Sequence, residues 1–246
     1  MCRHLAYVGP ALSLAVPVLD GPHALARQVR APRHQLPGVT NEDGWGTAWW
    51  EGPTIRRHRS TIPLPDDHDG HALVRAVHAS AFVAAVRRAT PGSALVETGN
   101  APFVADGLAF SLNGFVGGFY SSVVGGALRG ALDRHHDVDG DTDSEVLFAL
   151  VRDRIDAGSD PPSALAAVVD RALAAADGPS RLNLLLSDGE TVWATRHGNS
   201  LFSRRRPDGS VAVASEPWDD DPAWVEVPDG SVVAATAAWV EVADLA

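Results

Sequence analysis

The sequence predicts an α+β fold in which helices pack on antiparallel sheets, and three observations lead to this fold class. Apolar strand-like runs, separated by turns that contain Gly and Pro, occupy much of the first half of the chain. Two amphipathic helices follow, and short strands joined by tight turns fill the last third. Strands on both sides of a block of helices are typical of α+β folds, and we expect residues 1–246 to form a single domain.

Turn signals divide the chain up to position 114 into short elements. The first strand begins at Cys2 and is expected to end at Gly9-Pro10, and Glu51-Gly52-Pro53 forms a turn between two further strands. We expect strands at 2–8, 46–50, 54–59, 80–89 and 107–114, and short helices at 22–30 and 71–78.

Helical periodicity is clearest in the middle of the chain. Apolar residues recur at helical spacing between 146 and 155 and again between 165 and 173. Pro161 and Pro162 are typical of a helix start, and Gly178 is typical of a helix end. In the last third, the turn at 187–190 predicts a hairpin between strands at 182–186 and 192–195. Further strands are expected at 201–205, 211–214 and 232–235.

The composition excludes several classes of function. A formal net charge of −11 argues against a nucleic-acid partner or an anionic membrane surface. Lysine is absent, which excludes Schiff-base and pyridoxal-phosphate enzymes, Walker A phosphate loops and Ser-x-x-Lys hydrolases. The single cysteine excludes an internal disulfide and any multi-cysteine zinc or iron–sulfur site.

No metal and no cofactor are expected. His68, His71 and His78 fall in one helical region, but no carboxylate or cysteine clearly completes a ligand set, so we interpret them as surface histidines. The acidic run at 137–141 resembles a calcium loop, but Thr142 and Phe148 stand where an EF-hand needs Gly and Glu. We expect a solvated acidic loop there.

The apolar run at 5–18 raises the question of a targeting signal. Two prolines interrupt it, a single arginine precedes it, no convincing small-residue cleavage site follows it, and it is too short to span a bilayer. A buried first strand explains it better. We therefore expect a cytoplasmic protein, whereas removal of this run in a secreted protein would discard Cys2.

Cys2 follows the initiator methionine directly. Removal of Met1 would leave a chain that begins at Cys2, with a thiol and a free α-amine on one residue. Because an α-amine titrates near pH 7.7–8.0, roughly, it can accept the thiol proton without a histidine. The alternative is a small apolar residue on the first strand, which is the usual role of a lone cysteine.

Six short segments in order carry a resemblance to a known family. They are MCRHLAY at 1–7, NEDGWG at 41–46, RRATPG at 87–92, NAPF at 100–103, LNG at 112–114 and TDSE at 142–145. Together they resemble the class II glutamine amidotransferase domain, an N-terminal-nucleophile hydrolase, over roughly the whole chain. The resemblance implies a four-layer αββα sandwich. Leu112 stands where the family usually has histidine, and Arg88 where many members have tryptophan.

The resemblance also implies a role for each matching residue. Cys2 would be the nucleophile, and Asn113 with Gly114 would form the oxyanion hole. Arg87 and Thr90 would bind the α-carboxylate of a glutamyl group, and Asp143 would bind its α-ammonium. Without the family resemblance, Arg87 would be interpreted as a surface arginine and Asn-Gly as a turn. Asp143 would be interpreted as part of the capping box that Thr142 and Glu145 predict.

The segments MCRHLAYVG, DGWGTAWWEG and SEPWDDDPAW are similar to the ergothioneine-pathway branch of the family. This similarity implies a small-molecule substrate, γ-glutamyl hercynylcysteine S-oxide, which is hydrolysed through a Cys2 thioester to glutamate and hercynylcysteine S-oxide. The chain has no room for a second catalytic domain after its last strands, so we expect no obligatory synthase partner. Two alternatives remain open: a glutaminase subunit that supplies ammonia to a separate synthase, and a non-catalytic glutamyl sensor.

Two further expectations concern the surroundings of the site. The leaving group of this substrate carries a trimethylammonium, which aromatic faces bind well. Some of five tryptophans could bind this trimethylammonium, although packing in the core is the more common role of each. The five are Trp45, Trp49, Trp50, Trp218 and Trp224. The Gly- and Pro-rich stretch at 9–43 is the candidate lid.

Overall fold

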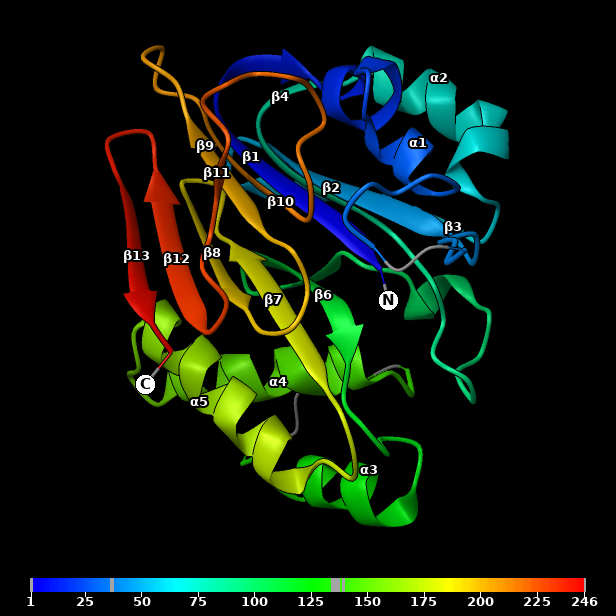
Figure 1. The fold of residues 1–246 in the computed structure, drawn as a ribbon, viewed down its shortest axis with the longest axis vertical. Helices are drawn as coiled ribbons and strands as arrows, with labels where there is room; N and C mark the ends of the chain where they lie inside the picture. The colour runs from blue at the N-terminus through cyan, green and yellow to red at the C-terminus, as the bar shows by residue number, and fades with distance from the viewer. Residues whose placement is uncertain (1, 36–37, 134–137, 139, 246) are drawn as a thin grey trace.

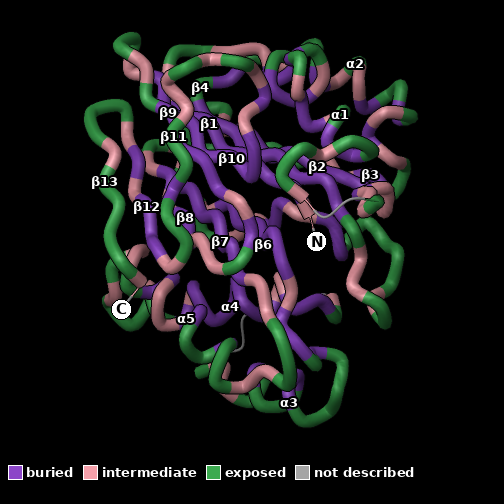
Figure 2. Tube along the Cα trace, viewed as in Figure 1, coloured by how far each residue is buried: buried purple, intermediate pink, exposed green. Residues whose placement is uncertain are grey.

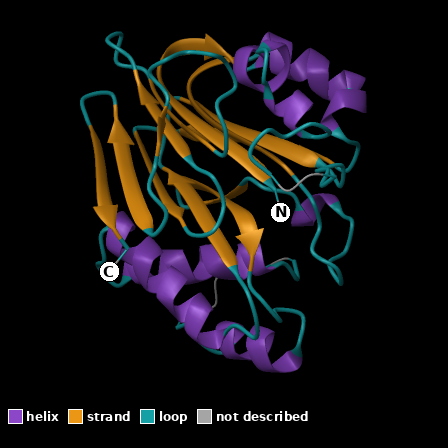
Figure 3. Ribbon diagram, in the orientation of Figure 1, coloured by secondary structure: helices purple, strands orange, loops and turns teal. Residues whose placement is uncertain are grey.

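The computed structural model describes residues 2–35, 38–133, 138 and 140–245, and it contains two antiparallel sheets with helices on their outer faces. Figure 1 and Figure 3 show the four layers: a pair of short helices, two facing sheets, and a second group of longer helices. The predicted α+β class and the αββα order of layers are therefore confirmed.

The first sheet has seven strands in the order β11-β9-β10-β1-β4-β2-β3. β1 lies in its middle and pairs with β10 and β4, so the residue before β1 is placed near the centre of the molecule (Figure 1). The strands are β1 (Arg3–Ser13), β2 (Trp45–Glu51), β3 (Thr54–Ser60), β4 (His78–Val86), β9 (Phe202–Arg205), β10 (Val211–Ala214) and β11 (Val225–Glu226).

The second sheet has six strands in the order β13-β12-β8-β7-β6-β5. Its middle strands β6 and β7 are almost entirely buried, whereas the edge strand β13 is mostly exposed (Figure 2). The strands are β5 (Phe103–Ala105), β6 (Leu108–Phe115), β7 (Arg181–Ser187), β8 (Thr191–Arg196), β12 (Ser231–Thr236) and β13 (Val240–Asp244).

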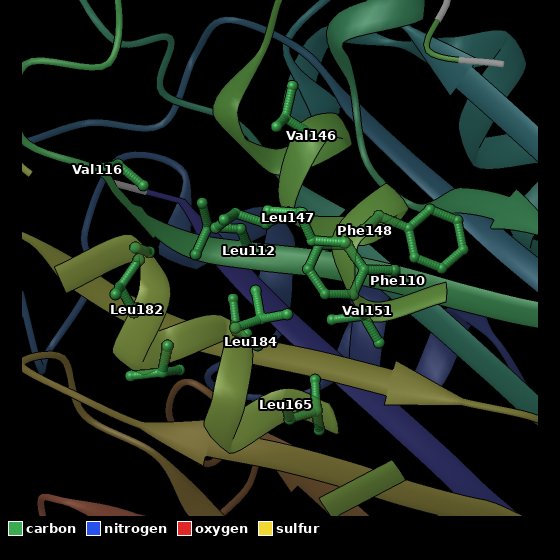
Figure 4. Packing of buried hydrophobic residues seen from close by; sticks show 14 of the residues in the cluster. Phe110, Leu112, Val116, Val146, Leu147, Phe148, Val151, Leu165, Leu182 and Leu184 are labelled. Carbon is green, nitrogen blue, oxygen red and sulfur yellow. The ribbon is translucent and has the colours of Figure 1, made fainter. Parts of the chain in front are cut away.

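Two helices, α1 (Leu25–Gln28) and α2 (His68–Ala76), cover the outer face of the first sheet. Three more, α3 (Ser122–Arg129), α4 (Asp143–Asp156) and α5 (Pro161–Ala175), cover the second. Figure 4 shows the core beneath this second group, where alternate residues of β6 and β7 such as Phe110 and Leu184 pack against Leu147 and Leu165. The remaining side chains of β6 face the other sheet, because successive residues of a strand point to opposite faces.

Small side chains fill the space between the sheets. Ala6 and Ala81 of the first sheet belong to one buried cluster with Ala109, Ala194 and Ala235 of the second. Alanines at this interface let the sheets approach closely, and Ser111 of β6 then contacts the side chain of His4 of β1.

The structure corrects several predicted boundaries. β1 does not end at Gly9-Pro10 but continues to Ser13, because its pairing with β4 shifts register between Val8 and Leu12. Such a shift accommodates a glycine and a proline without ending the strand. α1 is much shorter than the expected helix at 22–30, and it follows a π-helical turn at Val16–Asp20. α2 starts three residues early, at His68, because Asp67 caps it through the Gly70 amide.

Among the α-helices and strands that the structure describes, α3, β5, β11 and β13 were not predicted. α3 contains Gly125 and Gly126, which lower helix propensity, yet Val124 and Leu128 are buried against the other helices. A Cβ at Gly125 would meet the Phe119 carbonyl oxygen, so close packing explains that glycine. Tertiary contacts, and not local helix propensity, therefore account for the formation of this helix.

Two earlier expectations concern the surface. His71 Nε2 donates to the Leu64 carbonyl oxygen at 2.7 Å, and its ring meets His68 edge-on. Within the described ranges, no group of three or more His, Cys, Asp or Glu side chains is placed to hold a metal. Positions 137 and 139 of the expected acidic loop lie outside these ranges. No helix in the part of the chain described here is long and apolar enough to cross a membrane.

Candidate active site

A cavity that is open in part to solvent lies where β1 begins, where β4 and β6 end, and where α4 starts. Five of the six predicted site residues line it: Cys2, Arg87, Thr90, Gly114 and Asp143. These residues are far apart in the sequence, and the central place of β1 brings them together. Asn113, the sixth, is not among the residues that line the cavity.

Cys2 lies immediately before β1 and is half-buried. Its Sγ is 3.8 Å from the Arg88 carbonyl oxygen, a weak thiol contact that leaves the sulfur accessible from the cavity. Residue 1 lies outside the described residues, so the expected loss of Met1 remains a prediction.

His4, two residues along β1, is fully buried and does not provide a base for Cys2. Burial, and secondly the charge of Arg3, lowers the pKa of His4 to about 3, so its imidazole is neutral at physiological pH. Its Nδ1 is hydrogen-bonded to Ser111 Oγ at 3.2 Å. A base on the Cys2 α-amine is therefore consistent with the structure, because the neighbouring histidine is engaged elsewhere.

Arg87 is a buried cation at the edge of the cavity, directly after β4. Its Nη2 donates to Ser93 Oγ at 2.5 Å and to the Ala94 carbonyl oxygen at 3.1 Å, and its Nη1 donates to Asn100 Oδ1 at 3.2 Å. All of these acceptors are neutral. Among the residues that the structure describes, no carboxylate forms an ion pair with Arg87, so its charge is available to an anionic group of a ligand.

Asn100 is a site residue whose role the sequence did not assign, although the NAPF segment at 100–103 had been noted. Its Oδ1 accepts from Arg87 while its Nδ2 donates to the Ser60 carbonyl oxygen at 2.8 Å. Since the amide is fixed at both ends, it holds the guanidinium in one orientation. A Cβ at Gly99 would press on the Arg87 guanidinium, and this close approach accounts for the glycine before Asn100.

Asp143 is the buried anion of the same cavity and the first residue of α4. Its carboxylate accepts from the Val116 amide at 3.0 Å and from the Ser144 amide at 2.8 Å. Burial raises the pKa of Asp143 above its ordinary value, and these amide hydrogen bonds oppose the shift. The positive end of the α4 dipole also favours the carboxylate at this position.

The expected helix cap is present in part. Thr142 Oγ1 accepts from the Glu145 amide at 3.2 Å, as a capping box requires. The Glu145 carboxylate, however, accepts from the Gly140 amide rather than from that of Thr142. Glu145 therefore ties the preceding loop to the helix, and Asp143 keeps its place on the cavity wall.

Asn113 and Gly114 lie inside β6 and not in a turn. They pair with Asn183 and Leu182 of β7, so the interpretation of Asn-Gly as a turn dipeptide was wrong. A Cβ at Gly114 would overlap the carbonyl group of Arg181, so only glycine fits. Asn113 is fully buried with its side chain on the sheet face opposite Leu112, and its Nδ2 donates to Ser215 Oγ at 3.0 Å.

Ser215 places this amide next to the first residues of β1. Its Oγ also accepts from the backbone amide of His4 at 3.0 Å, so Asn113 Nδ2 shares a hydrogen-bond partner with the backbone two residues after Cys2. An amide carries two N–H groups. Within the described part of the chain, Ser215 Oγ is the only acceptor bonded to Asn113 Nδ2, so the second N–H of this nitrogen can donate to a ligand.

The two departures from the family pattern are both explained by position. Leu112 has its side chain in the apolar core under α4 as well as on the cavity wall, so it fills space there. Arg88 is exposed, and it contacts the Cys2 thiol through its backbone carbonyl alone. Neither substitution removes a group from the Cys2 side of the cavity.

The loop at 88–97 borders the cavity, and the stretch at 9–43 does not. Thr90 and Ser93 of this loop line the cavity opposite Tyr120, whose ring packs against Gly92. No residue of 9–43 that the structure describes lines the cavity. Instead, the His34 carbonyl oxygen accepts from Arg3 at 2.6 Å and its amide donates to Glu216 at 2.8 Å. These contacts do not support the lid assigned to 9–43, which stays a prediction.

The structure does not support the tryptophan hypothesis, which stays a prediction. None of the five rings is among the described residues of the cavity wall. Trp45 is fully buried and donates to Asp67 at 3.0 Å, which is a packing role. The faces of Trp218 and Trp224 are already covered by the Arg204 guanidinium, at 4.7 and 4.5 Å from the two ring centroids. A protein cation thus occupies the aromatic site that a ligand cation would need.

Comparison with known proteins gives the family of this chain. The sequence pattern of class-II glutamine amidotransferases matches residues 30–216. A γ-glutamyl-hercynylcysteine sulfoxide hydrolase of Mycolicibacterium smegmatis is 37% identical over 234 residues, which is 95% of each chain. The protein belongs to the class II glutamine amidotransferase family. This membership confirms the resemblance that the six sequence segments indicated.

Solved structures of class II amidotransferases share the fold. A glutamine aminotransferase class-II domain protein from Silicibacter pomeroyi matches over the whole of both chains with a TM-score of 0.70 and 26% identity. Glutamine phosphoribosylpyrophosphate amidotransferase from B. subtilis matches all of this chain and 49% of its own length, with a TM-score of 0.68 and 17% identity. At that identity the second match shows the fold alone.

Proposed function

We propose that this class II amidotransferase hydrolyses the γ-glutamyl amide bond of γ-glutamyl hercynylcysteine S-oxide, and that it releases glutamate and hercynylcysteine S-oxide through a Cys2 thioester. The observation that carries the proposal is the pair of buried, oppositely charged groups on one cavity wall, Arg87 and Asp143. A glutamyl group presents an α-carboxylate and an α-ammonium, and it would supply the missing partner of each. The named function of the 37% identical relative supports this choice of amide.

The chemistry follows from the groups around the cavity. The Cys2 thiol gives its proton to the α-amine of the same residue, and the thiolate attacks the γ-carbonyl carbon. A C–S bond forms, and the carbonyl oxygen takes the negative charge beside Asn113 and Gly114. The C–N bond then breaks as the proton passes to the leaving nitrogen. Water attacks the thioester, which releases glutamate and restores the thiol.

Partner-free hydrolysis tests this function. The purified protein alone should release glutamate from γ-glutamyl hercynylcysteine S-oxide with kcat/KM at least about tenfold above that for glutamine, because contacts to the leaving group add transition-state binding. Glutamine turnover that needs a synthase partner would instead support the ammonia-supplying subunit. Binding of γ-glutamyl compounds without turnover would support the sensor.

The activity should fall in acid with the titration of Asp143. The ionised carboxylate binds the α-ammonium, so this contribution to kcat/KM is full above the pKa of Asp143 and is lost as the pH falls through it. Because burial raises this pKa, the loss is expected at a higher pH than for an ordinary aspartate. Protonation of the Cys2 α-amine removes the base and also lowers kcat/KM, so the wild-type pH profile of kcat/KM should show two acid limbs. In Asp143→Asn the Asp143 limb should disappear, the α-amine limb should remain, and kcat/KM should be low throughout; two unchanged limbs in this variant would assign the first to another group.

A further inference from the structure

The orientation of the Asn113 side chain decides whether it can serve as an oxyanion donor. A carboxamide has an N–H₂ end and an oxygen end, and a half-turn about its axis exchanges them. If the oxygen faced the substrate carbonyl, it would repel the developing negative charge. Ser215 does not settle the orientation alone, since a hydroxyl both donates and accepts.

Asn199 contacts the other end of this carboxamide. Its Nδ2 donates to Asn113 Oδ1 at 3.2 Å and to the Asn113 carbonyl oxygen at 2.9 Å. Asn199 is buried on the connection between β8 and β9, and Asn183 of β7 holds its backbone through the amide and the carbonyl. Asn199 is itself an amide, however, so its own orientation must be set by a further group.

Arg181 sets that orientation. Its Nη1 donates to Asn199 Oδ1 at 3.0 Å. A guanidinium has donors only, so the oxygen of Asn199 must face Arg181 and its nitrogen must face Asn113. The Asn113 oxygen is then occupied by a donor, and its nitrogen is directed to Ser215 and the start of β1.

We propose that Arg181 and Asn199 are positioning residues that hold Asn113 with one N–H on Ser215 and the other directed to the substrate carbonyl oxygen. The inference rests on the proposed function, since it assigns a means of orientation to the oxyanion hole. Arg181 donates to Asn199, and Asn199 donates to Asn113. In a buried series of hydrogen bonds each bond strengthens the next. The dipole of the Asn113 carboxamide is thereby fixed before the reaction and needs no reorganisation during it.

The variant Asn199→Asp tests the proposal with almost no change in shape. A carboxylate at this position still accepts from Arg181, but it has no hydrogen to donate to Asn113. We expect kcat to fall by about tenfold or more while KM changes by less than about twofold, because the oxyanion forms only after binding. Arg181→Met should lower kcat in the same way, and Arg181→Lys, which keeps a donor, should restore most of it.

A double-mutant cycle separates the possible outcomes. Asn113→Ala alone should lower kcat by about 10²–10³, and adding Asn199→Asp should cause no further loss, because the effect of Asn199 passes through Asn113. An equal loss in both backgrounds, or wild-type kcat in Asn199→Asp and Arg181→Met, would overturn the inference. Normal kcat in Asn113→Ala would instead overturn the oxyanion role within the proposed function. If Asn199→Asp does not fold, the two Arg181 variants decide.

Discussion

Replacing Cys2 by alanine is expected to lower kcat by a factor of about 10⁴ or more, the scale on which a removed nucleophile acts. The thiol is half-buried, and its contact with the Arg88 carbonyl oxygen is weak, so the free energy of unfolding should change little. Stopped assays of glutamate release and a thermal melt measure the two quantities.

The same variant should still bind its substrate. The glutamyl contacts proposed for Arg87 and Asp143 are untouched by the change, so the Kd measured by calorimetry should stay within about threefold of the KM of the active enzyme. Residual turnover near the wild-type rate would exclude Cys2 as the nucleophile. Loss of binding together with turnover would show that the variant had disturbed the cavity.

Replacing Arg87 by lysine is expected to lower kcat/KM by about 10²–10³. Because Nη2 donates to both Ser93 and Ala94, the guanidinium keeps one Nη1 N–H and its Nε N–H for an α-carboxylate, and each bond to a charged group contributes about 1.5–3 kcal/mol. An ammonium cannot place its donors in the same directions, and it would also lose part of the set of bonds to Asn100, Ser93 and Ala94. Steady-state kinetics on the γ-glutamyl amide gives the value.

A substrate analogue that lacks the α-carboxylate is the matched control for this prediction. Wild-type enzyme should turn it over poorly, and Arg87→Lys should lower its kcat/KM by less than about threefold, because the contact is already absent. Arg171→Lys, an exposed change on α5, should leave both substrates unaffected. An equal loss on both substrates would mean that Arg87 maintains the loop at 88–97 and does not contact the carboxylate.

The sequence predicted those parts of the site whose chemistry lies in one short segment. Cys2, Arg87 with Thr90, and Asp143 at a helix start are each visible as local patterns, and all of them reach the same cavity. Their convergence depends on the central position of β1, which the order of elements indicated only through the family resemblance.

The supporting contacts could not be predicted, because they join residues far apart in the chain. Asn113 meets Ser215 across 102 positions and Asn199 across 86. The SEPWDDDPAW segment gave no role to Ser215, and no local pattern marks Asn199. Two glycines suggested a backbone conformation that the structure does not have. Gly9 suggested a strand end where the register shifts, and the Asn113-Gly114 pair suggested a turn where β7 approaches too closely for any side chain.

The electrostatic pattern of the molecule also depends on tertiary structure. Arg204 between Trp218 and Trp224 and Arg87 beside Asn100 look alike as sequence, since each is an arginine in an Arg-Arg run. In the structure the first is neutralised by Asp219 at 2.8 Å, whereas the second has neutral acceptors. Only the second arrangement leaves a buried charge for a ligand.

Mass spectrometry of the intact protein and of its peptides, with and without a glutamine-like electrophile, tests the central claim most directly. The account predicts loss of Met1 and a single adduct on Cys2, which is prevented by excess glutamate and absent in Cys2→Ala. Retention of Met1 would remove the proposed base. A trimmed chain that forms no adduct would contradict a reactive N-terminal thiol beside a glutamyl pocket.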